Sequence, residues 1–386
     1  MLVICDINIY KQGHYIGYNQ YLLDHADKIK EVSGIKECLF LFNEEGKEYL
    51  TTQPGVSVDY ISFPPQWRSS AWGRWKIWRR ILSKLSRIPV DQMYFMDFDK
   101  FQLPVGLSRT PFRISGIYFR PHHRISIYSD SGKQILITRI KRFKKILAEK
   151  LLLNNTALEK VFILNDSEGV SFLNSYHGRT VFKYLPDPIF DYPFEANQLK
   201  RNKEEIHFLL FGALTERKNI SLVLEAFGLA NFQKKAVLHL VGKTESEAYL
   251  NTLKKLATDH IKGQEHKKNI LFNTHFVSDE EMEKYHAQTD ISILVYRNFY
   301  GSSGLIGRAA KHRQFVLAPS VGLLASITQQ YNLGLTVDPL DVRAVAKSME
   351  HAEREINSHN YEGADRFYRE HHPSEFLSTL FSSDLQ

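Results

Sequence analysis

The sequence predicts an α/β protein made of two Rossmann-like, doubly wound domains that face each other across a cleft. Three observations support this fold class. The chain has 386 residues, more than one ordinary hydrophobic core accommodates. Short β-rich runs alternate with helical patterns along its whole length, as they do in parallel sheets. A segment rich in proline and charge divides these runs into two sets of similar length.

Thirteen apolar runs predict the strands of the two sheets. In the first half they lie at 2–8, 37–43, 56–63, 92–99, 112–119, 160–166 and 181–185. In the second half they lie at 205–212, 236–242, 269–276, 290–296, 314–320 and 333–338. We therefore expect a first domain at 1–190, a linker at 191–204, a second domain at 205–365, and a C-terminal helical segment at 366–386 that could cross back to the first domain.

Composition and charge fit a folded protein with anionic partners. Hydrophobic residues make up 43 % and charged residues 24 % of the chain, and 50 Lys and Arg exceed 43 Asp and Glu. Cys5 and Cys38 lie in apolar runs and are expected in the core as free thiols. The N-terminus has no basic region ahead of an apolar one, and no apolar run is long enough to span a membrane, so we expect a cytoplasmic protein.

The segment 211–227, FGALTERKNISLVLEAF, carries the sharpest signal. A strand ends at Gly212, a short loop holds Arg217 and Lys218, and an amphipathic helix follows. The carboxyl end of a strand and the start of a helix favour bound phosphate, and adjacent Arg and Lys suit a diphosphate. A solvated basic turn is the alternative interpretation of this segment.

A second anion-binding turn is predicted at 300–308, YGSSGLIGR. The small-residue loop GSSG precedes a helix that begins near Leu305, so backbone N–H groups could cradle a phosphate. Between the two loops, Ser278 and Glu281 form the sequence of a capping box that opens a helix. Taken alone, the GSSG turn is a weak signal, since any tight strand–helix turn could use it.

These segments resemble retaining glycosyltransferases of the GT-B fold, in the large GT4-like group known as glycosyl transferases group 1. The resemblance implies that Arg217 and Lys218 bind the donor diphosphate and stabilise the leaving nucleotide, which makes them the first catalytic candidates. It places the nucleotide base at the backbone of Phe276 and Val277. It assigns the rest of the donor site to Gly212 and to the loop and helix of Tyr300, Ser302, Ser303, Gly304, Leu305 and Arg308.

The sequence departs from the family pattern at two positions. The family carries two glutamates eight residues apart in this loop and helix, and the second of them holds the donor ribose. Here Tyr300 and Arg308 stand at those positions. Either Ser302 and Ser303 hold the ribose, or donor recognition has diverged. Asn219 also replaces the usual glycine after the lysine.

The first half offers weaker candidates for the donor and acceptor sides. By the family resemblance, the first loop, with Gly13 and His14, reaches toward the donor phosphates. The loop after strand 112–119 carries Arg120 on the acceptor side, and His122 and His123 as catalytic candidates beside the donor sugar, with His123 slightly preferred. Asp97 and Asp99 resemble the metal-binding DxD of another glycosyltransferase fold, but we interpret them as polar residues at a strand end. Asp99 could line the acceptor pocket, and no metal or cofactor is expected.

Two basic helices are predicted outside these motifs. The stretch 64–88 holds all four tryptophans, and Trp75, Trp78, Leu82 and Leu85 share one helical face. A basic, aromatic helix suits an anionic membrane surface at the inner face of the membrane, whereas packing of the same face inside the domain is equally consistent. The segment 137–153 repeats the basic character more weakly. Binding of nucleic acid is not expected, because no module for it is recognisable.

We therefore predict a metal-independent, retaining glycosyltransferase of the hexosyltransferase type. It would move a sugar from a nucleotide-sugar to a saccharide or lipid-linked acceptor in polysaccharide or glycan biosynthesis. The alternative from another class is a catalytically silent GT-B-like subunit that binds membrane or a partner enzyme. A GT-B epimerase or phosphorylase is a third option.

Overall fold

The computed structural model describes residues 1–10, 15–125, 132–194, 204–299 and 301–382, and they divide into two compact units. The first unit comprises Met1–Pro188 together with the chain from Pro373 onward, and the second comprises Ile189–His372. None of the described helices combines the length and the hydropathy that crossing a membrane requires.

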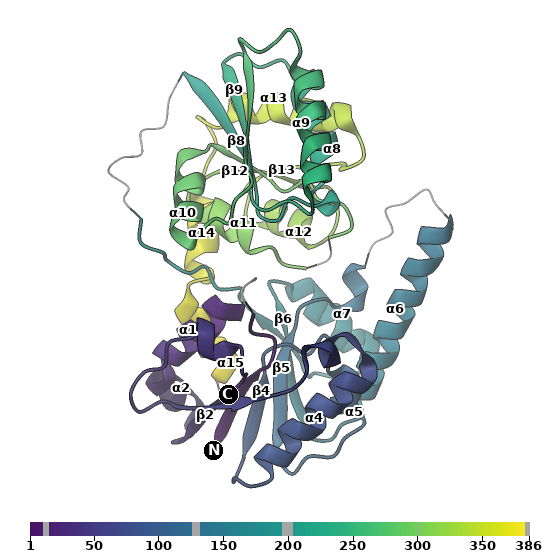
Figure 1. Cartoon of the computed structure of the whole chain (residues 1–386), viewed down its shortest axis with the longest axis vertical. Helices are drawn as coiled ribbons and strands as arrows, with labels where there is room; N and C mark the ends of the chain where they lie inside the picture. Colours follow the sequence, from purple (N-terminus) through teal and green to yellow (C-terminus); the bar gives the residue numbers. More distant parts are fainter. Residues whose placement is uncertain (11–14, 126–131, 195–203, 300, 383–386) are drawn as a thin grey trace. The chain divides into compact units, whose positions relative to one another are not determined.

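The first unit is built on a seven-stranded parallel sheet in the order β3-β2-β1-β4-β5-β6-β7 (Figure 1). Its strands are β1 (Leu2–Asp6), β2 (Cys38–Asn43), β3 (Ser57–Ile61), β4 (Gln92–Phe95), β5 (Arg113–Tyr118), β6 (Leu158–Leu164) and β7 (Phe182–Leu185). Its helices are α1 (Tyr15–Asp24), α2 (Ala26–Ser33), α3 (Gly46–Tyr49), α4 (Ala71–Leu85), α5 (Gln102–Gly106), α6 (Gly132–Leu153), α7 (Ser167–His177) and α15 (Pro373–Phe381), with 3₁₀ turns η1 (Pro65–Ser69) and η2 (His122–Arg124).

The second unit has a six-stranded parallel sheet in the order β10-β9-β8-β11-β12-β13. Its strands are β8 (Glu205–Phe211), β9 (Lys235–Val241), β10 (Lys268–Asn273), β11 (Ile291–Ile293), β12 (Phe315–Pro319) and β13 (Gly334–Val337). The connecting elements are the 3₁₀ turn η4 (Glu216–Lys218) and helices α8 (Ile220–Leu229), α9 (Glu247–Ile261), α10 (Asp279–Gln288), α11 (Gly304–Lys311), α12 (Leu323–Gln330), α13 (Val342–Glu355) and α14 (Glu362–Glu370).

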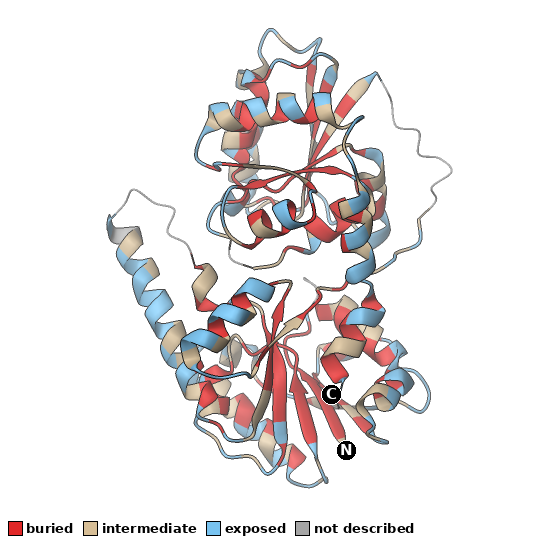
Figure 2. Cartoon of the chain, turned by 180° about the vertical axis from the view of Figure 1, so that it is seen from behind, coloured by how far each residue is buried: buried red, intermediate tan, exposed pale blue. Residues whose placement is uncertain are grey.

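Both sheets follow from buried apolar strands, which Figure 2 draws in red along the sheets. All five residues of β1 and all five of β12 are buried, as expected for parallel strands covered on both faces. Each of the thirteen expected strand ranges overlaps a strand, so the prediction of two doubly wound α/β units is confirmed. In each sheet the strand order reverses beside the first strand, which places the ligand crevice at the carboxyl ends of β1 and β4 and of β8 and β11.

The buried face of helix α4 shares Trp78 and Leu85 with the predicted one. Its buried residues are Gly73, Ile77, Trp78, Ile81 and Leu85, whereas Trp75 and Leu82 are half-buried. The indole N–H of Trp78 donates a hydrogen bond to the Ser108 hydroxyl at 2.8 Å. The apolar stripe of this helix therefore belongs mainly to the core of its own unit, although Trp72 at its start is 67 % exposed.

Candidate functional site

Lys218 is a buried cation at the carboxyl end of β8. Gly212, with a φ of 93°, turns the chain out of the strand, and η4 then carries Arg217 and Lys218. The Lys218 ammonium group donates hydrogen bonds to the Phe211 carbonyl and, at 3.1 Å, to the Tyr296 hydroxyl oxygen. Burial and, to a smaller extent, the neighbouring Arg217 together lower the pKa of Lys218 to about 7.

Gly212 leaves room for this lysine. A Cβ atom at position 212 would lie 3.2 Å from the Lys218 Nζ atom and 3.8 Å from the Leu305 Cδ1 atom. The turn after β8, the lysine and the start of α11 therefore meet at one place. The structure thus brings together residues that are almost a hundred positions apart in the sequence.

The segment after β11 contacts both the loop of Arg217 and Lys218 and the GSSG turn. The Tyr296 hydroxyl group, which accepts from Lys218, also hydrogen-bonds the side chain of Ser303. The Arg217 guanidinium lies 4.9 Å from the centre of the Phe299 ring. The backbone carbonyl of Arg217 accepts a hydrogen bond from the Arg297 N–H at 2.9 Å. These contacts fix the position of both loops against the end of β11.

The helix α11 presents its N-terminus at the same place. Ser303 is the residue before the helix, and its side chain does not cap the first backbone N–H groups. Gly304 is exposed, while Ser302 and Leu305 are half-buried. Uncapped N–H groups beside Lys218 and Arg217 make a site for an anion, because all of these groups present positive charge.

Arg308, which the family resemblance placed at the ribose, is engaged inside its unit. Its guanidinium donates to the Glu283 carboxylate at 2.5 Å and to the Phe190 carbonyl. Lys311 and His312 contact the other oxygen of Glu283 at 3.1 and 2.5 Å. Glu283 thus supplies from α10 a buried carboxylate next to α11, a partner that the sequence analysis did not identify. Tyr300 lies outside the described residues.

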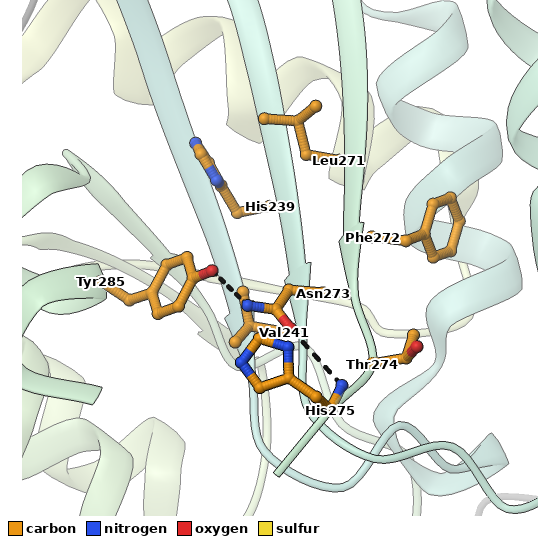
Figure 3. A pocket seen from close by; sticks show the side chains of 8 residues that line it. All are labelled: His239, Val241, Leu271, Phe272, Asn273, Thr274, His275 and Tyr285. Atoms are coloured by element: carbon orange, nitrogen blue, oxygen red, sulfur yellow. Dashed lines mark hydrogen bonds between the residues drawn. The ribbon is translucent and has the colours of Figure 1, made fainter. Parts of the chain in front are cut away.

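A pocket of about 570 Å³ opens at the ends of β9 and β10 (Figure 3). It is lined by His239, Val241, Leu271, Phe272, Asn273, Thr274, His275 and Tyr285. The chain leaves this pocket through Phe276, whose side chain is 68 % exposed, and Val277. The predicted capping box is confirmed, because the Ser278 hydroxyl accepts from the Glu281 N–H and the Glu281 carboxylate accepts from the Ser278 N–H. Phe276 and Val277, which were predicted to seat the base, follow His275 of this pocket in the chain but do not line the pocket themselves.

His122, in the first unit, is almost fully buried. Its Nδ1 atom lies 2.5 Å from the Glu149 carboxylate, which also contacts His177 Nε2 at 3.2 Å and the Tyr118 hydroxyl at 2.6 Å. Burial favours the neutral acid, but these hydrogen bonds outweigh it and lower the pKa of Glu149 to about 2. Among the described residues, His122, Glu149 and His177 are the one group whose ligand atoms lie close enough to hold a metal, within 4.8 Å of one another. The hydrogen bonds already satisfy the carboxylate, so the group needs no ion to explain it.

His123 contacts a different carboxylate from His122. Its Nε2 atom lies 3.0 Å from the Asp166 carboxylate, which also accepts from the Arg124 guanidinium. Burial would raise the pKa of Asp166, but the hydrogen bonds from Arg124 and His123 hold it below its ordinary value. The His123 Nδ1 atom is buried without a hydrogen-bond partner. A Cβ atom on Gly169 would lie 2.4 Å from His123 Nε2, so a glycine is required beside this ring.

The strand-end carboxylates of the first unit are hydrogen-bonded to their surroundings. Asp97 accepts from the Asn8 amide and the Tyr15 hydroxyl at 3.2 Å each, and from the Asp99 N–H. Burial, with Asp99 and Asp6 nearby, raises the pKa of Asp97 to about 7. Asp99 accepts from the Phe119 N–H at 2.7 Å, and its other carboxylate oxygen lies 3.4 Å from Lys145 of α6.

The other candidates of the first unit are Arg120, Gly13 and His14. The Arg120 side chain is exposed, and its backbone carbonyl accepts a hydrogen bond from Lys145. Gly13 and His14 lie outside the described residues. The sequence analysis did not identify Asp6, which is buried beside Asp97 and has its pKa raised to about 6, chiefly by burial. Its place at the carboxyl end of the first strand was the signal that could have found it.

Solved structures of known proteins share the fold of this chain. The chain is similar to sucrose-phosphate synthase from Thermosynechococcus elongatus, with a TM-score of 0.71 and 13 % identity over 98 % of this chain and 96 % of that one. It is also similar to WaaG, a glycosyltransferase involved in lipopolysaccharide biosynthesis (TM-score 0.61, 12 % identity, 99 % and 97 % covered). A third similar structure is HepE of Anabaena in complex with UDP (TM-score 0.60, 13 % identity, 99 % and 95 % covered). The fold is that of the GT-B glycosyltransferases.

A match to a protein family lies within the second unit. Residues 205–354 match the family described as Glycosyl transferases group 1. No curated protein sequence matches the chain. The second unit is therefore a glycosyltransferase domain of this group, the GT4 family, and the matched range contains both loops that meet at Lys218.

Proposed function

We propose that this protein transfers a sugar from a nucleotide-sugar donor, with retention and without a metal, to a saccharide or lipid-linked acceptor. The observation that carries the proposal is the buried Lys218 beside Arg217 and the N-terminus of α11. A buried ammonium group whose nearest charged neighbour is another cation is unfavourable until an anion binds. The diphosphate of the donor fits that requirement, and its charge grows as the sugar leaves, which these groups would stabilise.

The nucleoside end of the donor would lie at Phe276 and Val277. The exposed Phe276 ring offers a surface for a base, and the adjacent pocket offers polar groups from Asn273, His275 and Tyr285. Arg308 is bound to Glu283, so the ribose would be held by Ser302 and Ser303. Uridine diphosphate is the first nucleotide to test, because the similar HepE structure contains UDP.

The first unit would supply the acceptor side. His123 is a better candidate for contact with a substrate than His122, because His122 is tied to Glu149 whereas His123 retains an unpaired Nδ1 atom. Asp99 and Arg120 follow the ends of β4 and β5, where an acceptor would enter. The similarity to WaaG, a glycosyltransferase involved in lipopolysaccharide biosynthesis, supports a role in glycan synthesis.

Calorimetric titration with UDP, GDP and ADP tests this function. We expect one of them to bind, and Arg217→Ala and Lys218→Met each to weaken that binding at least about tenfold, since each removes a charged hydrogen bond to phosphate. Lys268→Met is the matched control. Lys268 is also a buried lysine with a lowered pKa, but it lies at the amino end of β10, where its ammonium group donates to Gly228. Absence of binding by all three nucleotides would favour the silent GT-B-like subunit.

The sugar and the reaction type need a second experiment. Incubation of the full chain with nucleotide hexoses, with and without saccharide acceptors, followed by mass spectrometry, separates transfer from epimerisation. A product that contains the acceptor, with retained anomeric configuration by NMR, is the expected result. A changed sugar nucleotide formed without an acceptor would indicate an epimerase instead.

A further inference from the structure

Helix α6 has an apolar face that its own unit does not cover. Only its C-terminal part joins the core, through Leu152 and Leu153, while Glu149 bonds to His122. The remainder extends away from the sheet of the first unit (Figure 1), and Figure 2 draws most of it as exposed. None of the described residues from Leu136 to Lys144 is buried.

The exposed apolar side chains form a continuous stripe. Leu136, Ile140, Phe143 and Leu147 recur at intervals of three and four residues, so they share one face of the helix. Between 45 % and 66 % of each of these side chains is accessible to solvent. Apolar side chains are stabilised by removal from water, and these four do not gain that stabilisation within their own unit.

Basic residues lie on both sides of the stripe and on the opposite face of the helix. Arg139, Lys141, Arg142 and Lys144 are all exposed, and the acidic residue of α6 is Glu149 near its other end. Helical spacing places Arg139 on one side of the stripe and Lys144 on the other, where long side chains can reach past an apolar surface to charged groups above it. The face of α6 is thus apolar in the middle and cationic at its edges.

We propose that α6 lies on a lipid surface that carries anionic headgroups, with Leu136, Ile140, Phe143 and Leu147 inserted among the acyl chains. Charge complementarity selects this occupant, because a Lys or Arg close to an anionic lipid surface is attracted to it. A second copy of the chain fits less well, since pairing two α6 helices through this stripe would bring their cationic edges together.

On this proposal the lipid surface contacts α6 and not the stretch 64–88. In α4 the side chains of Ile77, Trp78, Ile81 and Leu85 are in the core, whereas the apolar stripe of α6 faces solvent. Lys145 of α6 also contacts the Asp99 carboxylate and the Arg120 carbonyl. Docking of α6 would therefore hold these acceptor-side residues near the lipid surface. This last step rests on the proposed glycosyltransferase function, whereas the binding of lipid does not.

Co-sedimentation of the full chain with vesicles tests the proposal. We expect binding to vesicles of phosphatidylcholine with phosphatidylglycerol, and much weaker binding to phosphatidylcholine alone. Binding should fall at about 1 M NaCl, where the Debye length is about 3 Å. The double variant Ile140→Ser with Phe143→Ser should lose at least about tenfold in vesicle affinity, because it removes most of the inserted area. The control Leu229→Ser changes an apolar side chain that is 56 % exposed on α8 and should bind as the unchanged chain does.

A charge-reversed pair separates the electrostatic contribution. Arg139→Glu with Lys144→Glu should weaken binding to the anionic vesicles, whereas Lys254→Glu with Lys255→Glu, two exposed lysines on α9, should not. Equal binding to both vesicle types, or equal loss in both charge variants, would overturn the proposal. A dimer in light scattering that the Ile140→Ser, Phe143→Ser variant abolishes, without vesicle binding, would show that a second copy covers the stripe. Nucleotide titration of the same samples, without lipid, reports the donor site separately.

Discussion

The Lys218 ammonium group donates a hydrogen bond to the Tyr296 hydroxyl oxygen at 3.1 Å, and both residues are buried. Burial raises the pKa of Tyr296, so the phenol remains neutral. The lysine thus rests on a neutral hydroxyl and a backbone carbonyl, and neither compensates its charge as a carboxylate would. An arriving diphosphate would meet a cation whose hydrogen bonds can be exchanged for stronger, charge-assisted ones.

The pH dependence of stability should report this lysine. The pKa of Lys218 is about 7 in the folded protein and near 10.5 in an unfolded chain. Between these values the unfolded chain binds more protons, so this group makes the fold more stable as the pH rises. Between about pH 7 and about pH 10 the apparent melting temperature should rise more for the unchanged chain than for Lys218→Met. Parallel curves for the two proteins would contradict the assignment.

Gly212→Ala should weaken both stability and nucleotide binding. Its φ of 93° is costly for alanine, by about 1–3 kcal/mol, and the new methyl group would crowd the Lys218 ammonium group. Gly263→Ala is the matched control, since Gly263 has a φ of 79° and open space around its Cβ position. Melting curves should show a loss in both variants. Calorimetry with UDP should show a loss in Gly212→Ala alone, and an equal effect of both on binding would refute the role of this glycine.

Glu283→Gln should destabilise the second unit strongly. Glu283 is fully buried and faces Arg308, Lys311 and His312, whose interactions lower its pKa against the effect of burial. Loss of its charge leaves the buried Arg308 guanidinium without its carboxylate partner, which costs about 3–5 kcal/mol. Asp365→Asn breaks the exposed pair with Arg313 and should cost at most about 1 kcal/mol. Denaturant unfolding measures both values, and similar costs would contradict a structural role for Glu283.

Asp97→Asn should change how stability depends on pH at the acidic side. The pKa of Asp97 is about 7 in the folded chain and near 3.8 in an unfolded one. The folded chain therefore binds more protons between about pH 4 and about pH 7, and this group makes it less stable as the pH rises. The melting temperature of the variant should fall less across that pH range than the melting temperature of the unchanged chain. The same loss in both would show that Asp97 is ionised in the fold.

Sequence patterns found the donor-side segments but not the partners of their residues. The family motif named Arg217, Lys218 and the GSSG turn because these are local in sequence. It did not indicate that Tyr296 and Ser303 would connect the two loops, or that Glu283 would bind Arg308. Those contacts join separate strands and helices, so they depend on how the sheet orders its strands.

The sequence alone determined the α/β class and the thirteen strands, because the burial of parallel strands requires local apolar runs. It also indicated that α4 and α6 are amphipathic and basic. Only the tertiary structure decided what covers each apolar face. The face of α4 packs on its sheet around Trp78, whereas the stripe of α6 at Phe143 faces solvent. Amphipathic spacing specifies that a face is apolar, but its neighbour is set by contacts between residues distant in the chain.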